Sequence, residues 1–320
     1  MKIVFLGAGA FGLPSLAALA ASGHEVVGVI SQPDRPAGRG GKMTATPVAA
    51  WAEGRGMKVL KTEDVNAAEA LTAVRGMGAE CLVVIAFGQK LSDEFLRVAK
   101  FGGINLHSSL LPKYRGAAPI NWAVINGDAE AGVSVIEVTN VMDGGDILAE
   151  ARTAVGEAET AGELHDRLAA LGAPLLPRVL DELAAGTVRR VKQDVTLKSK
   201  APKLSREIAW VDFSRPAAEV SARIRGLSPW PGVQVELTDA AGKVRGAVTL
   251  LKCRAVGSTP HGAEQCGVVA KDRTVTCGAG AIEVITVLPA GKKAMGLAAF
   301  ANGYGFGEGA RVRSVVAPGK

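Results

Sequence analysis

The sequence of 320 residues is 48% hydrophobic and 21% charged, which is typical of a folded globular protein, excludes a disordered chain and predicts two domains. Its apolar runs are too short to span a membrane, no secretory leader is recognisable, and the four cysteines lack metal-ligand spacing, so we expect a cytoplasmic protein with reduced thiols and no metal. The net charge of +6 arises from residues 206–320, which carry 15 basic and 9 acidic side chains, whereas residues 1–205 carry 22 of each.

Strand-like and helical patterns alternate through the first half of the chain. Pro14 stands in the first turn of the helical segment that follows the first strand, and Gly23 is its expected C-cap. This alternation predicts an α/β domain with an open, doubly wound, mostly parallel sheet, whose ligands bind beyond the carboxyl ends of the strands. The expected strands are residues 2–7, 25–31, 57–61, 80–88 and 103–107.

Gly7, Gly9 and Gly12 form a G-x-G-x-x-G pattern directly after the first expected strand, which is the spacing of a dinucleotide-binding turn. Such a fold also needs an acidic residue at the end of the second strand to bind the ribose hydroxyls. That strand ends at Ile30 and is followed by serine and glutamine. We therefore expect no NAD, and we attribute the glycines to positive φ angles and close packing in a strand-to-helix turn.

Chemistry-bearing residues come at the end of the fifth expected strand and in a later turn. Asn105 and His107 alternate along that strand, so their side chains point to the same side. An asparagine amide can donate to an oxygen that gains negative charge, and histidine suits proton transfer near neutral pH. In the turn D-G-G-D, residues 143–146, Asp143 can reach the imidazole, whereas for Asp146 we expect turn capping by the side chain.

The second half of the chain has a different sequence pattern. A helical pattern over residues 160–185 closes the α/β unit, and RRVKQDVTLKSKAPKLSR at 189–206 then holds seven basic residues and one acid. This stretch is either a solvated linker or a basic arm that faces a polyanion. The β-rich runs beyond it, separated by Gly and Asp turns, predict a small antiparallel barrel or sandwich. We expect a catalytic domain at 1–188, a basic linker at 189–205 and a C-terminal domain at 206–320.

The order and spacing of Asn105, His107, the sequence Ser-Leu-Leu-Pro and the D-x-G-D turn resemble the catalytic centre of formyltransferases that use 10-formyltetrahydrofolate. Across essentially its full length, the sequence is most similar to the methionyl-tRNA formyltransferase family, notably at residues 31–52, 203–205 and 288–295. The resemblance implies transfer of the formyl group from 10-formyltetrahydrofolate to the amino group of initiator methionyl-tRNA. It also implies a Rossmann-like catalytic domain and a C-terminal barrel of the oligonucleotide-binding-fold type that binds tRNA. We expect a monomer.

The resemblance further assigns roles to individual residues. Asn105 would donate to the oxyanion of the tetrahedral intermediate, His107 would stabilise that oxyanion or shuttle the proton, and Asp143 would orient and charge the imidazole. Arg35, Arg39 and Lys42 stand among prolines and glycines without apolar periodicity, which suits an arm that is mobile until it meets nucleic acid, with a solvated surface loop as the alternative. The expected folate contacts are Phe87, Gly88, Leu91, Ser109, Leu110, Leu111, Pro112 and Val141, and the expected tRNA contacts are Arg35, Arg39, Lys42 and Lys203.

Other readings of the same residues are open. An enzyme that hydrolyses 10-formyltetrahydrofolate or formylates a sugar nucleotide could share the catalytic residues, but small substrates need no extended basic path. An NAD-dependent oxidoreductase would use the glycines but lacks the ribose acid. A non-catalytic RNA-binding module would explain the charge and leave Asn105, His107 and Asp143 without a role.

Overall fold

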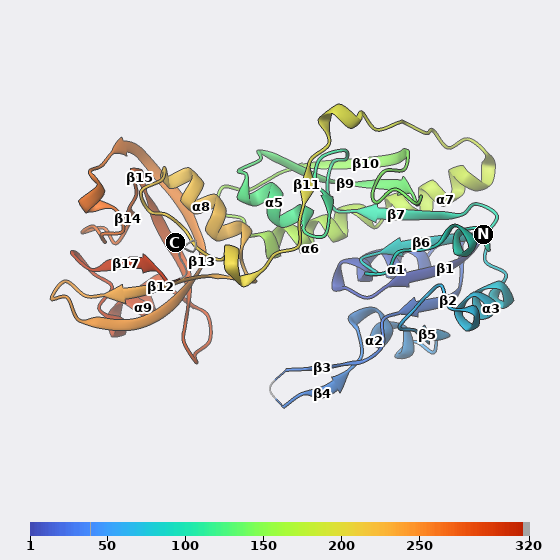
Figure 1. Ribbon diagram of the computed structural model, residues 1–320, viewed down its shortest axis with the longest axis horizontal. Helices are drawn as coiled ribbons and strands as arrows, with labels where there is room; N and C mark the ends of the chain where they lie inside the picture. Colours follow the sequence, from blue (N-terminus) through green and yellow to red (C-terminus); the bar gives the residue numbers. More distant parts are fainter. Residues whose placement is uncertain (39, 316–320) are drawn as a thin grey trace. The chain divides into compact units, whose positions relative to one another are not determined.

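Figure 1 shows the computed structural model, which describes residues 1–38 and 40–315. The chain folds into two compact units with different sheets, one mostly parallel and one antiparallel. In the part of the chain that is described, no helix has the length and apolar character needed to cross a membrane. The first unit comprises Met1–Gly116, Gly132–Thr153 and His165–Lys200, and the second comprises Ala117–Ala131, Ala154–Leu164 and Ala201–Lys320.

The first unit is built on a seven-stranded sheet in which all five expected strands are present. Strands β1, β2, β5, β6 and β7 pair in parallel, and β9 pairs antiparallel to β7. Residues 3–7 of β1 are buried, which explains why this strand reads as a continuous apolar run rather than an alternating one. In sheet order, the strands are β10 (Ile147–Ala154), β9 (Glu130–Glu137), β7 (Gly103–His107), β6 (Cys81–Ile85), β1 (Lys2–Gly7), β2 (Glu25–Ser31) and β5 (Val59–Lys61).

The helices of the first unit differ from the sequence expectation in two places. The helix expected over 160–185 is two helices, because Pro174 has no backbone N–H to continue the ladder between them. The first helix ends at Ala20 with Ala21 as its C-cap, so the prediction that Gly23 is the cap was wrong. The helices are α1 (Leu13–Ala20), α2 (Pro47–Glu53), α3 (Ala68–Met77), α4 (Asp93–Leu96), α6 (Ala161–Gly172) and α7 (Leu175–Ala185), with the short 3₁₀ turns η1 (Ala10–Gly12) and η2 (Val195–Leu197).

The glycine turn after β1 is explained by close packing alone. A Cβ atom on Gly7 would lie 2.7 Å from the Phe5 ring and 2.9 Å from the Ile85 carbonyl oxygen, and one on Gly12 would lie 3.2 Å from Phe5. Gly9 and Gly12 have φ angles of −75° and −79°, so the expected positive φ is absent there. The G-x-G-x-x-G spacing thus reflects the approach of the turn to neighbouring atoms of the sheet.

A short hairpin stands within the segment expected to be a mobile basic arm. Strands β3 (Arg35–Ala37) and β4 (Lys42–Thr44) pair antiparallel, and Figure 1 shows the hairpin extending away from the sheet of the first unit. Gly38 and Gly41 adopt φ angles of +70° and +62°, which glycine tolerates without strain. Three-residue strands and a glycine-rich tip are too short to give a periodic signal in the sequence.

The second unit is the β-rich domain that the sequence predicts. Its antiparallel sheet runs β14–β15–β13–β12–β17, with β16 paired to β15. Residues 267–269 hydrogen-bond to β17 on one side and to residues of β14 on the other, which brings the curled sheet close to a closed barrel. The strands are β12 (Val233–Thr238), β13 (Val244–Pro260), β14 (Val275–Thr276), β15 (Ala279–Pro289), β16 (Met295–Gly296) and β17 (Arg311–Ser314).

Helix α8 (Ala217–Gly226) packs on β13 and β15 and fills one side of this second core. Its buried side chains include Val220 and Ile224, four residues apart on one helix face.

A two-stranded ladder joins β8 (Arg115–Gly116) to β11 (Lys200–Ala201). The remaining elements are α5 (Pro119–Ile125), α9 (Leu297–Tyr304) and the 3₁₀ turns η3 (Arg206–Ile208) and η4 (Ala263–Gln265).

Candidate active site

The predicted catalytic residues lie at the carboxyl end of β7, in the first unit. Asn105 and His107 are the third and fifth residues of this strand, so they share one face, while Leu106 between them is buried in the core. Because β6 runs parallel to β7, its carboxyl end lies at the same edge of the sheet. This is the edge at which open α/β sheets bind their ligands.

His107 is held by protein groups on both ring nitrogens. The ring is 6% exposed, and its Nε2 lies 3.0 Å from the carbonyl oxygen of Tyr114. A carbonyl oxygen only accepts hydrogen bonds, so Nε2 carries a hydrogen. The other nitrogen, Nδ1, lies 3.6 Å from Oδ1 of Asp143, which is longer than a hydrogen bond. Nδ1 is therefore the ring nitrogen that faces the Asp143 carboxylate without a hydrogen bond to it.

Asp143 reaches His107 from a tight turn. Its φ angle is +50°, a left-handed conformation that aspartate tolerates better than most residues. Its Oδ2 accepts a 2.8 Å hydrogen bond from the Gly116 N–H, which leaves Oδ1 facing the imidazole. A Cβ atom on Gly145 would collide with the carbonyl of Glu137. The glycines of this turn thus let the backbone fold closely enough for Asp143 to face the ring.

Asp146 does not cap the turn as expected. Among the described residues, none donates a hydrogen bond to its carboxylate, whereas its backbone carbonyl accepts from the N–H of Glu137. Of the two aspartates in this turn, Asp143 is the one whose carboxylate accepts a hydrogen bond from another segment, from the N–H of Gly116.

The amide of Asn105 is available to a ligand. Its side chain is half-buried, and no described residue hydrogen-bonds to it. An unsatisfied primary amide beside a buried histidine and a carboxylate is a suitable donor for an oxygen that develops negative charge.

Sequence reasoning missed a second group of residues that touches the Asp143 turn. Nε2 of Gln193 donates to the carbonyl oxygens of Asp143 and Gly145, at 2.8 Å each. Oε1 of Gln193 accepts from Nε and Nη2 of Arg115, at 3.1 and 2.6 Å. Gln193 lies 50 residues after Asp143 in the sequence, within the basic stretch at 189–206. No local sequence pattern distinguishes it from its neighbours.

The Ser-Leu-Leu-Pro loop follows His107 and is fixed by buried hydrogen bonds. Oγ of Ser109 donates to the carbonyl of Lys113 at 2.6 Å, and Oγ of Ser134 accepts from the N–H of Leu111 at 3.1 Å. Leu110 fills the space that a side chain would take at Gly132, where a Cβ atom would lie 2.5 Å from it. Ser134, a fully buried residue of β9, was another member of this arrangement that the sequence did not reveal.

The other expected folate contacts differ in how they could meet a ligand. Phe87 and Leu91 are buried in the core of the first unit, so their side chains are not exposed to a ligand. The Phe87 carbonyl accepts a 3.0 Å hydrogen bond from Nε2 of Gln32, and Gly88 has a φ angle of +83°. Val141, two residues before Asp143, is an apolar side chain exposed to 55%.

The expected tRNA contacts lie on exposed segments. Arg35 in β3 pairs with Glu63 at 2.6 Å, and both side chains are exposed. Lys42 in β4 and Lys203 in the second unit are exposed, and neither side chain pairs with another described residue. Arg39 lies outside the described residues.

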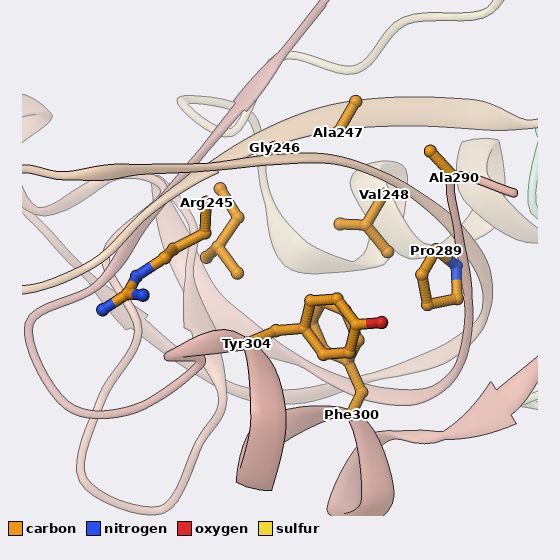
Figure 2. Close-up of a pocket in the computed structure, with 9 residues that line it drawn as sticks. Arg245, Gly246, Ala247, Val248, Pro289, Ala290, Phe300 and Tyr304 are labelled. Atoms are coloured by element: carbon orange, nitrogen blue, oxygen red, sulfur yellow. The ribbon is translucent and has the colours of Figure 1, made fainter. Parts of the chain in front are cut away.

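Figure 2 shows a pocket of about 150 Å³ in the second unit. The Tyr304 and Phe300 rings stack there with centroids 4.5 Å apart, beside Val248 and Pro289. The charged residue of the pocket, Arg245, already forms an ion pair with Asp239 at 2.7 Å. The residues that line this pocket include no acid–base pair comparable to His107 and Asp143. No cluster of metal-ligating side chains occurs in residues 1–38 and 40–315.

Comparisons with known proteins show the family to which the chain belongs. Residues 1–180 match the formyl transferase family model, and residues 203–305 match the model of the formyl transferase C-terminal domain. The chain is 39% identical to the methionyl-tRNA formyltransferase of Solibacter usitatus, over 95% of this chain and 96% of that one, and 41% identical to that of Moorella thermoacetica over the same shares.

Solved structures show the same fold at much lower identity. The N-formyltransferase of Helicobacter canadensis, in complex with folinic acid and dTDP-3-aminofucose, aligns with a TM-score of 0.62 at 16% identity, over 90% of this chain and 98% of that one. The sugar 3N-formyltransferase WlaRD aligns with a TM-score of 0.63 at 15% identity, over 92% and 99%. With both family models and close relatives matched over nearly the whole length, the chain belongs to the methionyl-tRNA formyltransferases of the formyl transferase family.

Proposed function

We propose that this chain transfers the formyl group of 10-formyltetrahydrofolate to the amino group of initiator methionyl-tRNA, giving N-formylmethionyl-tRNA and tetrahydrofolate. The single observation that carries the proposal is the arrangement at the end of β7. There, a free amide (Asn105), a buried imidazole (His107) and a carboxylate (Asp143) converge on one edge of the sheet. The names of the relatives, at about 40% identity, support the choice of acceptor.

The chemistry requires a C–N bond to form and another to break. The neutral amine of methionyl-tRNA attacks the formyl carbon, whose oxygen becomes an oxyanion stabilised by the Asn105 amide, a type of donor that contributes about 3 kcal/mol. The attacking nitrogen then loses one proton and the leaving N10 of the folate gains one. Nδ1 of His107 is placed to hold that proton, because Nε2 is engaged with Tyr114 and Asp143 faces Nδ1.

The two substrates would meet this edge from different surfaces. We assign the pterin to the neighbourhood of Gly88, Val141 and the Ser-Leu-Leu-Pro loop, which offers backbone groups and apolar atoms near His107. We assign tRNA to the hairpin of β3 and β4, to the basic linker at 189–205 and to a C-terminal domain at 206–320 that carries the net charge of +6. We place this reaction in the cytoplasm, with the chain acting as a monomer.

A radiolabel assay tests the function directly. Purified protein is mixed with 10-formyltetrahydrofolate that carries a labelled formyl group, and the acceptor is initiator methionyl-tRNA, uncharged tRNA or a dTDP-linked amino sugar. Label should appear on methionyl-tRNA alone, and Asn105→Ala and His107→Ala should reduce its rate at least 100-fold. Transfer to the amino sugar but not to methionyl-tRNA would refute the proposed acceptor.

A further inference from the structure

We propose that Gln193 is a positioning residue for formyl transfer, whose side-chain amide holds the Asp143 turn so that the carboxylate faces His107. The inference rests on the proposed function and adds to it a residue of the basic linker. Under this proposal, the linker is part of the catalytic centre's framework as well as a connection between domains.

The hydrogen bonds of Gln193 point inward to the turn and to one supporting side chain. Both hydrogens of its Nε2 are used, one on the carbonyl of Asp143 and one on that of Gly145. Its Oε1 accepts two hydrogen bonds from the guanidinium of Arg115, an arrangement that fixes which end of the amide faces the turn. The amide therefore holds the residues on both sides of Gly144 at once.

The Asp143 turn needs such support. Asp143 has a left-handed φ of +50°, and the backbone passes Glu137 so closely that position 145 has no room for a side chain. Besides Gln193, the Gly116 N–H donates to Oδ2 of Asp143, the Gly144 N–H donates to the Val141 carbonyl, and the Glu137 N–H donates to the Asp146 carbonyl. The carbonyls of this turn would be free to rotate without a donor, and rotation about Asp143 would swing Oδ1 away from Nδ1 of His107.

Gln193 is more buried than its neighbours in the linker. Within residues 189–200, only Gln193 and Ser199 are half-buried, and the others are exposed. Oγ of Ser199 accepts from the N–H of Tyr114 at 2.9 Å, and the carbonyl of Tyr114 holds Nε2 of His107. Of these two half-buried linker residues, Gln193 therefore contacts the turn that holds Asp143, and Ser199 contacts Tyr114, which holds His107.

Two substitutions separate positioning from general stability. Gln193→Glu keeps an acceptor for Arg115 and gains an ion pair with it, but it cannot donate to the two carbonyls and places a negative charge beside the turn. Gln193→Ala removes the amide altogether. Thr187→Ala is the control, because Thr187 lies six residues before Gln193, outside the linker, and is exposed.

Steady-state kinetics with labelled 10-formyltetrahydrofolate and methionyl-tRNA, together with thermal unfolding, test the proposal. We expect kcat to fall at least tenfold in Gln193→Glu and in Gln193→Ala, while KM for both substrates stays within twofold. The melting temperature of Gln193→Glu should stay near the wild-type value, and Thr187→Ala should match wild type throughout.

The proposal is overturned if Gln193→Glu retains the wild-type kcat, since its lost donors would then be dispensable. It is also overturned if KM for either substrate rises while kcat is unchanged, because Gln193 would then act in substrate binding rather than in positioning Asp143. Wild-type protein that formylates no methionyl-tRNA rejects the proposed function, and this inference falls with it. Active wild type with fully active variants rejects the role of Gln193 alone.

Discussion

At the scale of single residues, the candidate site depends on which nitrogen of His107 can exchange a proton. The Tyr114 carbonyl fixes a hydrogen on Nε2, so a neutral ring presents the lone pair of Nδ1 to the Asp143 carboxylate. The arrangement therefore suits a proton that is taken up from the attacking amine and released to the leaving nitrogen.

Asp143→Asn tests whether the negative charge of the Asp143 carboxylate takes part in proton transfer by His107, with little change in side-chain shape. Asparagine tolerates the left-handed φ of +50°, and its carbonyl oxygen can accept from Gly116 as Oδ2 does now. Its NH₂ group would then donate to Nδ1 of His107 and hold the ring neutral. We expect single-turnover formyl transfer to slow by about 10²–10⁴-fold, the range of general acid–base catalysis, with an unchanged melting temperature.

Asp143→Ala serves as the contrasting variant. It loses the acceptor for Gly116 and puts alanine at a positive φ, so both activity and melting temperature should fall. Wild-type turnover in Asp143→Asn would show that the carboxylate charge has no part in the reaction.

The proximity of the three candidate catalytic residues could be predicted from the sequence because each lies at the end of a strongly patterned strand or in a glycine turn. Asn105 and His107 follow from strand alternation, and Asp143 follows from the paired glycines after it. Gln193 and Ser134 could not be predicted in this way. Their contacts are made with residues distant in the chain, and nothing in their own neighbourhood distinguishes them from ordinary linker and strand residues.

At the scale of elements, buried parallel strands gave the clearest signal, since both faces are covered and the run is continuously apolar. The break at Pro174 was missed because the apolar period continues across it from α6 to α7. The hairpin of β3 and β4 was missed for the opposite reason, because the six residues of its two strands are all exposed and carry no apolar pattern.

The hairpin leads to a prediction about which of its basic residues binds tRNA. Arg39, between two glycines, carries a guanidinium whose fork of donors suits phosphate or a base edge better than lysine does. Arg35 is instead engaged by Glu63. We expect Arg39→Ala to lower kcat/KM for methionyl-tRNA severely without changing KM for the folate, Arg39→Lys to restore it in part, and Arg35→Ala to have the smaller effect.

Glu63→Gln provides the matched control for the hairpin. It removes the carboxylate that engages Arg35, so kcat/KM for methionyl-tRNA should rise slightly. The measurement is kinetics at varied methionyl-tRNA and fixed folate. If Arg39→Ala equals wild type, the hairpin is not the contact with the acceptor end, and the C-terminal domain must carry recognition alone.

At the scale of the whole molecule, the distribution of cysteines predicts a single reactive thiol. Burial raises the pKa of Cys81 and Cys277 to about 12 and that of Cys253 to about 11, so these thiols are neither ionised nor accessible near pH 8. Cys266 is half-buried. A disulfide reagent at pH 8 should label one thiol rapidly in the native chain and four after unfolding, and Cys266→Ser should abolish the rapid phase. Rapid labelling in that variant would mean that one of the units opens readily.

The charge distribution predicts how binding responds to salt. The excess of +6 falls in residues 206–320, preceded by the basic linker, so contacts with tRNA phosphates should release counterions and weaken as salt rises. Between about 50 and 200 mM salt, log kcat/KM for methionyl-tRNA should fall linearly with log salt, while KM for 10-formyltetrahydrofolate changes far less.

Lys203→Ala should reduce the slope by about one, since Lys203 is exposed and its side chain pairs with no described residue. Lys100→Ala is the control, because Lys100 precedes β7 at the amino end of the strand, opposite the edge with Asn105 and His107. Equal slopes for the Lys203 variant, the Lys100 variant and wild type would exclude Lys203 from the path of the tRNA backbone.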